Sequence, residues 1–174
     1  MLFTLQGKAK CAEEIAFVSG AFKRSIPIED VELLATEGIA RGLLRDVLRF
    51  SNQDQQKVSE LLNEKIDVPI VLTSNLLNSK IGEVIIERIA RIIYPVRLPD
   101  KKISVPAIRA AVIKGAYQGK GKLNVIGFVK AYPNKTMAIN LPAVMQVIDK
   151  VDSIADLVKF FSNSPLNGLK GMQR

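Results

Sequence analysis

The segment Ser79-Lys-Ile-Gly-Glu-Val-Ile-Ile-Glu-Arg-Ile-Ala-Arg-Ile-Ile93 carries the clearest helical pattern in the chain. Its apolar residues recur at intervals of three and four, and they are Ile81, Val84, Ile85, Ile89, Ile92 and Ile93. Residues at this spacing share one face of a helix, so the pattern predicts an amphipathic helix over about 79–93 that ends at Tyr94-Pro95. The charged residues between them are expected to face solvent.

Shorter segments with the same kind of pattern lie on both sides of this helix. They predict helices over about 27–37, 40–49, 51–62, 68–77, 104–118, 122–131, 141–150 and 153–161. Ser79, Ser104 and Asn140 are expected to cap the helices that follow them, and Ser51 with Asp54 resembles a capping box. No fixed-period repeat runs through these segments, so a solenoid is not expected.

Two short strands are predicted near the start of the chain. Ile15-Ala-Phe-Val18 and Phe22-Lys-Arg-Ser-Ile26 flank a Ser19-Gly20 turn, and Lys135–Ile139 alternates enough to be a third strand that could pair with this hairpin. The predicted fold class is therefore mainly α, a compact bundle of about nine short helices with a minor two- or three-stranded β element at about 15–26 and 135–139.

One domain is expected. A single helical domain over 13–162 would follow a poorly ordered N-terminal segment or signal remnant over 1–12 and precede a flexible tail or linker over 163–174. No apolar run approaches the roughly 18 residues that span a bilayer, so an integral membrane protein is excluded.

The composition argues against the common kinds of catalysis. The sequence has no His, which removes His-based triads and His metal ligands, and its single Cys, Cys11, cannot form an internal disulfide. No Gly-x-Ser-x-Gly string is present, and Gly115 to Lys122 misses the phosphate-loop pattern and is interpreted as a helix end and a connection. We therefore expect no catalytic, cofactor-binding or metal-binding residues and no cofactor. An unusual esterase is left open only as a minor alternative.

Positive charge is concentrated in the middle of the chain. Residues 80–135 hold twelve Lys and Arg against three Asp and Glu, a balance of +9 in a chain whose net charge is +8. Such a segment can attract anionic lipid, nucleic acid or an acidic protein, or it can simply be a solvated face. The candidate contacts to an anionic surface are Arg88, Arg91, Lys101, Lys102, Lys114, Lys120, Lys122 and Lys130.

Lipid is preferred to nucleic acid as the anionic partner. The basic residues are mostly Lys, whereas base reading relies on Arg, Asn and Gln. The helix predicted over 122–131 follows another across a Gly-containing turn, as in a helix-turn-helix, but it reads Leu-Asn-Val-Ile-Gly-Phe-Val and is too apolar to read bases. Sequence-specific binding of nucleic acid is therefore not expected.

Two longer strings resemble a known family. Phe22-Lys-Arg-Ser-Ile-Pro-Ile-Glu-Asp-Val-Glu-Leu-Leu-Ala-Thr-Glu-Gly38 resembles the opening of the helical domain that precedes predicted alpha/beta hydrolases in cyanobacteria, domain of unknown function 1400. Leu123-Asn-Val-Ile-Gly-Phe-Val-Lys-Ala-Tyr-Pro-Asn-Lys-Thr-Met-Ala-Ile-Asn140 is similar to its closing segment. The resemblance covers about residues 13–160, and it departs at Pro27, where relatives tend to place a capping Ser.

The resemblance implies a non-catalytic accessory domain that packs on, or gates, an alpha/beta hydrolase domain or another protein. No family catalytic residue can be carried over, because no position of this sequence matches one. It also implies an exported or periplasmic protein, whereas a native N-terminus at Met1 would favour the cytoplasm. The alternative function is a basic adaptor for an anionic surface. Whether a catalytic domain follows Arg174 in the natural gene, and which oligomeric state forms, are left open.

Overall fold

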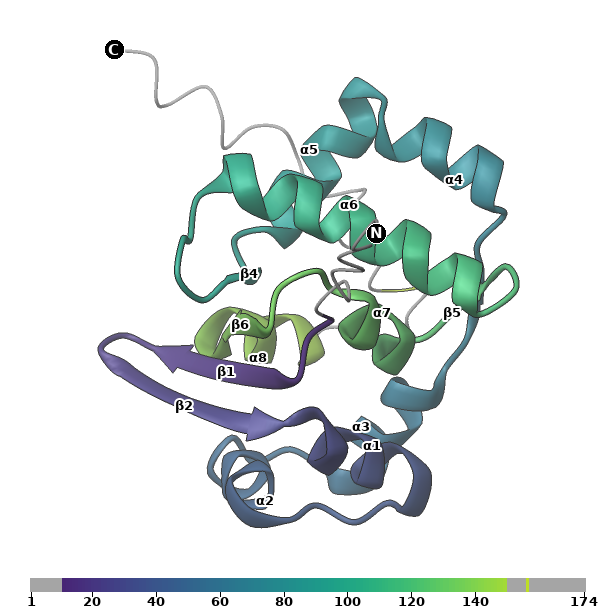
Figure 1. Cartoon of the computed structure of the whole chain (residues 1–174). Coiled ribbons are helices and arrows are strands. Elements are labelled where there is room, and N and C mark those ends of the chain that lie inside the picture. The colour runs from purple at the N-terminus through teal and green to yellow at the C-terminus, as the bar shows by residue number, and fades with distance from the viewer. Residues whose placement is uncertain (1–10, 150–155, 157–174) are drawn as a thin grey trace, which may run out of the picture.

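The computed structural model describes residues 11–149 and Asp156 (Figure 1). Within that part of the chain, 57% of the residues are helical, in eight helices, and the strands form one mixed sheet of four and a second sheet of two. The fold is thus a mixture of α and β. The prediction of a mainly α bundle with a minor strand element is wrong, because the sheet lies at the centre of the fold and includes strands that the sequence pattern did not indicate.

The helices are α1 (Ile28–Glu37), α2 (Gly42–Phe50), α3 (Gln55–Asn63), α4 (Ile70–Leu77), α5 (Lys80–Ile89), α6 (Lys101–Gln118), α7 (Val125–Ala131) and α8 (Leu141–Ile148). The strands are β1 (Glu14–Ser19), β2 (Phe22–Pro27), β3 (Ile66–Asp67), β4 (Ile93–Pro95), β5 (Lys122–Leu123) and β6 (Thr136–Asn140). The helix predicted over 153–161 lies outside the described residues apart from Asp156, as does the tail predicted over 163–174.

The larger sheet is organised around β1. Its strand order is β2-β1-β6-β4, with β1 antiparallel to β2 and parallel to β6. Ile15 is paired with Ile26 on one side and with Met137 on the other. Gly20, with a φ of 58°, supplies the left-handed backbone of the hairpin turn. The predicted hairpin and its pairing with the third strand are therefore confirmed.

The fourth strand, β4, replaces the end of the predicted helix over 79–93. Helix α5 ends at Ile89, and Ile93 pairs antiparallel with Ile139 of β6. The Ile92 carbonyl also accepts a hydrogen bond of 2.8 Å from the Asn140 backbone. Ile92, just before β4, is buried, as it would also be on the apolar face of a longer helix. The apolar pattern alone therefore does not separate a strand here from a longer helix.

Helix ends were predicted with mixed success. The Ser79 side chain accepts a hydrogen bond from Gly82 N, and Asn140 accepts one from Ala143 N, so both predicted N-caps are confirmed. The Gly115–Lys122 segment forms the end of α6 and a turn, as expected.

Two other predicted caps are wrong. Asp54, rather than Ser51, caps α3 and accepts a hydrogen bond from Lys57 N. Asp100, rather than Ser104, caps α6, which therefore starts at Lys101; Ser104 is buried and donates its hydroxyl to the Asp100 carbonyl at 2.8 Å. In both cases a carboxylate competes with a nearby Ser, and sequence spacing does not decide between them.

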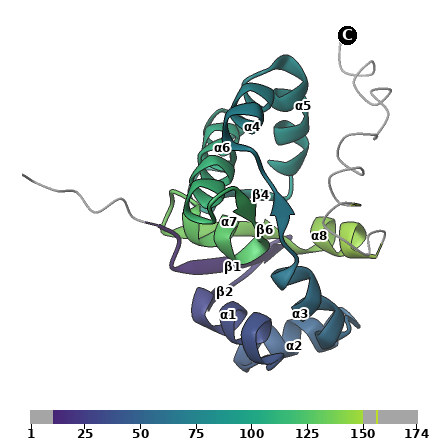
Figure 2. The same ribbon diagram turned by 90° about the vertical axis from the view of Figure 1, so that its right-hand side faces the viewer.

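Helices surround the sheet on two sides. Figures 1 and 2 show α4, α5 and α6 above the sheet and α1, α2 and α3 below it, with α8 beside β6. The main core cluster joins the two sides, since it includes Leu44 of α2, Ile15 of β1 and Ile108 of α6. Burial of these side chains is the main contribution that holds the two groups of helices to the sheet.

Candidate interaction surfaces

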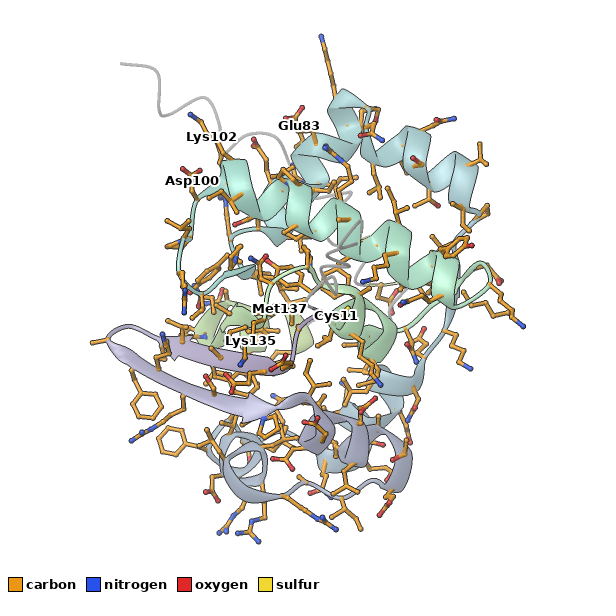
Figure 3. All side chains as sticks on the ribbon, in the orientation of Figure 1. Cys11, Glu83, Asp100, Lys102, Lys135 and Met137 are labelled. Carbon is orange, nitrogen blue, oxygen red and sulfur yellow. The ribbon has the colours of Figure 1, made fainter. Side chains whose placement is uncertain are left out.

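The eight predicted anionic-surface contacts do not gather in one place. Arg88 and Arg91 lie at the end of α5 and just after it, Lys101 and Lys102 in the first turn of α6, Lys114 within α6, Lys120 and Lys122 in the turn and strand after it, and Lys130 on α7. Helix α6 has 18 residues and is therefore about 27 Å long. Figure 3 places Lys102, with Asp100 and Glu83, at one end of that helix, so the basic adaptor hypothesis requires contacts at both of its ends.

Several of these lysines face acidic side chains. Lys101 Nζ lies 3.2 Å from Glu87 Oε1 and Lys122 Nζ lies 3.1 Å from Asp67 Oδ1. Lys130 pairs with Glu32 of α1. The side chains in these pairs are largely exposed, and each pair contributes about 0–1 kcal/mol. Asp67 and Glu32 come from the acidic first part of the chain, so folding partly neutralises the positive middle segment.

Lys114 has a different environment from the other candidates. It is half-buried, and its Nζ donates to Cys11 Sγ at 3.0 Å. Cys11 directly precedes Ala12, whose backbone N–H donates to the Tyr132 carbonyl. This contact therefore ties the segment before β1 to the middle of α6.

Tyr132, which follows α7, is a core residue. Its side chain is fully buried beside Phe128, and its hydroxyl has no hydrogen-bond partner among the residues that the structure describes. Burial raises the pKa of Tyr132 above its ordinary value of 10.0, because the phenolate would lose its hydration. The phenol therefore stays neutral under ordinary conditions and is unsuited to act as a base or nucleophile.

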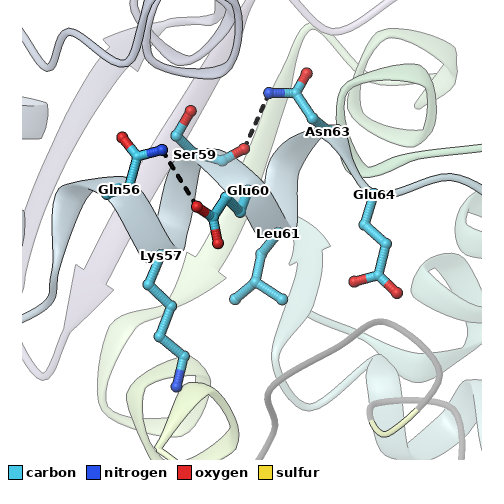
Figure 4. A pocket seen from close by; sticks show the side chains of 7 residues that line it. All are labelled: Gln56, Lys57, Ser59, Glu60, Leu61, Asn63 and Glu64. Atoms are coloured by element: carbon cyan, nitrogen blue, oxygen red, sulfur yellow. Dashed lines mark hydrogen bonds between the residues drawn. The ribbon is translucent and has the colours of Figure 1, made fainter.

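An open hollow of about 540 Å³ lies along α3 (Figure 4). Its lining residues come from this one helix and from Glu64, which directly follows it. Ser59 and Asn63 both donate side-chain hydrogen bonds to the Ala35 carbonyl of α1, and Gln56 donates to Glu60 at 3.2 Å. Because these polar groups hold α3 to α1 or bond within α3, the hollow does not bring catalytic groups to a common point.

A second hollow, of about 280 Å³, is lined in part by the glycine-rich segment from Gly115 to Lys122. Its glycines have packing roles. A Cβ atom on Gly115 would lie 2.6 Å from Leu123 Cδ1 and 3.1 Å from the Gly127 carbonyl oxygen, so only glycine permits this approach of α6 to α7. Lys122, on the rim, is already paired with Asp67. The interpretation of this segment as a helix end and connection fits these contacts.

Helix α4 carries an apolar surface that the sequence analysis did not identify. Val71 is 76% exposed and Leu76 50% exposed, and among the α4 side chains that the structure describes none is buried. Ile81 of α5 is 69% exposed and directly follows Ser79 and Lys80. A Cβ atom on Gly82 would lie 2.0 Å from the Leu76 carbonyl oxygen, which shows how closely α5 begins against the end of α4.

We call Val71, Leu76 and Ile81 the α4–α5 apolar face. Arg109 of α6 donates a hydrogen bond of 3.0 Å to the Leu77 carbonyl at the end of α4, and this bond holds α4 to α6. A signal was present in the sequence, since no charged residue occurs from Val68 to Ser79. That run reads equally well as a buried core helix, so sequence alone did not reveal that it faces outward.

The described residues contain neither a metal-binding cluster of side chains nor a membrane-spanning helix. No group of three or more Cys, Asp and Glu side chains there could hold a metal ion. None of the helices in that part of the chain is long and apolar enough to cross a membrane.

Fold and surfaces together define a small α/β domain whose candidate sites are outward-facing surfaces rather than a converging pocket. The chain belongs to the family described as alpha/beta hydrolase of unknown function (DUF1400), whose model matches residues 11–140. The match begins just before β1 and ends with β6, so it includes the whole four-stranded sheet. Neither a curated protein nor a solved structure matches the chain. The family resemblance is thus confirmed, and the chain is a hydrolase-related domain.

Proposed function

We propose that this domain is a non-catalytic accessory domain that packs against the catalytic domain of an alpha/beta hydrolase and screens the entrance to its cleft. The observation that carries the proposal is the α4–α5 apolar face. Exposed apolar residues that gather on a surface mark a place where another surface binds, and Leu76 and Ile81 lie at the close junction of α4 with α5. Family membership supplies the class of partner, because the matched family is one of alpha/beta hydrolases.

Two features support a contact role rather than a catalytic one. Helix α4 contributes no charged side chain, which suits the centre of a protein interface, where charged residues are depleted. The sequence also has no His to act as the general base of a hydrolase triad. In the described four-stranded sheet, β1 and β6 form the one parallel strand pair. The sequence has no Gly-x-Ser-x-Gly motif, which in alpha/beta hydrolases places the nucleophilic serine at a turn from a strand into a helix.

Binding to a separately purified catalytic domain from this family tests the proposal. Calorimetry would measure the affinity, and hydrolysis of nitrophenyl esters of increasing chain length would report any screening of the cleft. We expect binding by the unaltered chain and a loss of at least tenfold in affinity for Val71→Glu/Leu76→Glu, since each carboxylate would be buried without a partner.

A matched variant controls for the added charge. Ala21→Glu/Ala110→Glu adds the same two carboxylates at exposed positions on the hairpin turn and on α6, and it should bind as the unaltered chain does. The proposal fails if the unaltered chain neither binds the catalytic domain nor changes its chain-length preference. It also fails if the two double variants bind equally well.

The intact mass of the protein from its native source is an independent check. A polypeptide that continues past Arg174 into a segment with Gly-x-Ser-x-Gly and a His would place the partner in the same chain. A partner on a separate chain would instead require affinity in solution, which the binding measurement above determines.

A further inference from the structure

Helix α2 presents a row of arginines to solvent. Arg41, the N-cap residue of α2, and Arg45 and Arg49 within the helix are spaced four residues apart and all are exposed, whereas Leu44 and Leu48 of the same helix are 5% and 8% exposed. The row spans about 12 Å along the helix axis. The acidic residue on this helix is Asp46, whose Oδ1 lies 3.9 Å from Arg45 Nε, and both side chains are more than half exposed. The outward side of α2 therefore carries a net positive charge.

The same helix ends in a protruding aromatic residue. Phe50 is the last residue of α2 and is 97% exposed, the largest exposure among the large apolar side chains of the described residues. A second exposed ring, Phe22 of β2, is 55% exposed and stacks with the Arg24 guanidinium, 5.4 Å from the ring centroid.

We propose that the arginine face of α2, defined as Arg41, Arg45, Arg49 and Phe50, binds an anionic lipid surface. The planar guanidinium fork donates two parallel hydrogen bonds to a phosphate, so the arginines match phospholipid headgroups. An aromatic side chain beside basic residues enters the boundary between headgroups and acyl chains. Binding of this kind is peripheral and needs no membrane-spanning helix.

Shape favours lipid over nucleic acid as the occupant. The exposed half of a surface helix is convex and can rest on a flat bilayer. Proteins that hold single-stranded nucleic acid use a positively charged groove and several stacking rings in series, whereas α2 offers one ring, at its end.

The arginine face also differs from the basic residues of the middle segment. Lys101, Lys122 and Lys130 are paired with carboxylates and lie on separate elements. The three arginines instead lie within the N-cap and helix of α2, where the one acidic residue is Asp46. The face uses no residue of α4 or α5, so it is independent of the proposed hydrolase contact.

Co-sedimentation of the full chain with vesicles tests this inference. The vesicles are phosphatidylglycerol mixed with phosphatidylcholine, and pure phosphatidylcholine serves as the neutral reference. We expect binding to the anionic vesicles alone, weakening as salt is raised. Arg41→Gln/Arg45→Gln/Arg49→Gln should reduce partitioning on the order of 100-fold, and Phe50→Ala about tenfold.

Matched variants separate this face from net charge. Lys80→Gln/Lys102→Gln/Lys120→Gln removes the same charge from exposed lysines on other elements, and Tyr117→Ala removes a ring that is 73% exposed on α6. Both should change partitioning less than about fivefold, since exposed charges beyond a Debye length from the lipid are screened. Unchanged urea midpoints would show that all variants are folded.

Three results would overturn the proposal. The first is no binding of the unaltered chain to anionic vesicles at low salt. The second is equal loss for the arginine and lysine variants, which would make net charge the cause. The third is displacement of the protein from vesicles by single-stranded RNA that the arginine variant no longer binds, which would assign the face to nucleic acid instead.

Discussion

Helices α2 and α4 have nine and eight residues and lie at opposite ends of the molecule (Figure 1). Helix α2 buries Leu44 and Leu48 and presents Arg45 and Arg49 to solvent. Helix α4 has no charged residue, presents Val71 and Leu76 to solvent, and buries none of its described side chains. The leucines at 44 and 48 are therefore packed within the fold, whereas Val71 and Leu76 of α4 are left exposed.

This difference shows why charge and hydropathy must be considered on the folded surface. The segment before residue 80 has nine Lys and Arg against eleven Asp and Glu, so its composition does not indicate a basic region. Yet its three α2 arginines share one exposed row. The basic residues of the most basic segment, 80–135, are instead distributed over several elements from α5 to α7, and two of them, Lys130 and Lys122, are paired with Glu32 and Asp67.

Truncation of one leucine on each helix should give the largest contrast. Leu44→Ala on α2 removes a side chain that is 5% exposed and should lower the free energy of unfolding by about 3 kcal/mol, because it leaves a cavity. Leu76→Ala on α4 removes one that is 50% exposed and should cost less than about 1 kcal/mol. Urea unfolding measures both, and equal losses would contradict the comparison.

Tyr132→Phe tests the core that the two ends share. Removal of the unpartnered buried hydroxyl should raise the free energy of unfolding by about 1 kcal/mol. The main core cluster contains residues of α2, α5 and α6, so both ends should unfold in one transition. Two separate transitions by circular dichroism and by intrinsic fluorescence would show that the ends are independent.

The same variant has a predicted pH dependence. In the folded chain, burial holds the pKa of Tyr132 above 10.0, so the unfolded chain releases this proton first as pH rises. The unfolded state then binds fewer protons than the folded state, and stability falls above about pH 10. Tyr132→Phe lacks this group, so the difference by which its free energy of unfolding exceeds that of the unaltered chain should grow between about pH 9 and pH 11. A constant difference across that range would show that Tyr132 ionises normally when folded.

A double-mutant cycle on Lys101 and Glu87 should give the smallest effect. This pair joins α5 to α6 near the α4 end of the molecule, and its side chains are 67% and 37% exposed. Lys101→Gln and Glu87→Gln should show a coupling below about 0.5 kcal/mol that disappears in high salt. A coupling above about 1 kcal/mol would mean that electrostatics, rather than apolar packing, holds the two helices together.

Local signals in the sequence were enough for many of the elements. The hairpin around Gly20, the strand near Ile139 and the caps at Ser79 and Asn140 each depend on neighbouring residues, and all four were predicted. The strand at Ile93 was missed because its pairing partner, β6, lies more than forty residues further along the chain. The candidate surfaces were missed because exposure of Val71 or Phe50 depends on what the rest of the chain covers.

The sequence by itself determined the family, the short helices and the absence of His, since these follow from residue identity and short-range spacing. Only the tertiary structure decided that β1 and β6 pair in parallel at the centre of a mixed sheet, and that α2 presents arginines while α4 presents apolar side chains. The physical reason is that burial and strand pairing are properties of contacts between distant segments. A periodic apolar pattern states which side chains prefer to leave water, and the fold then determines which of them do.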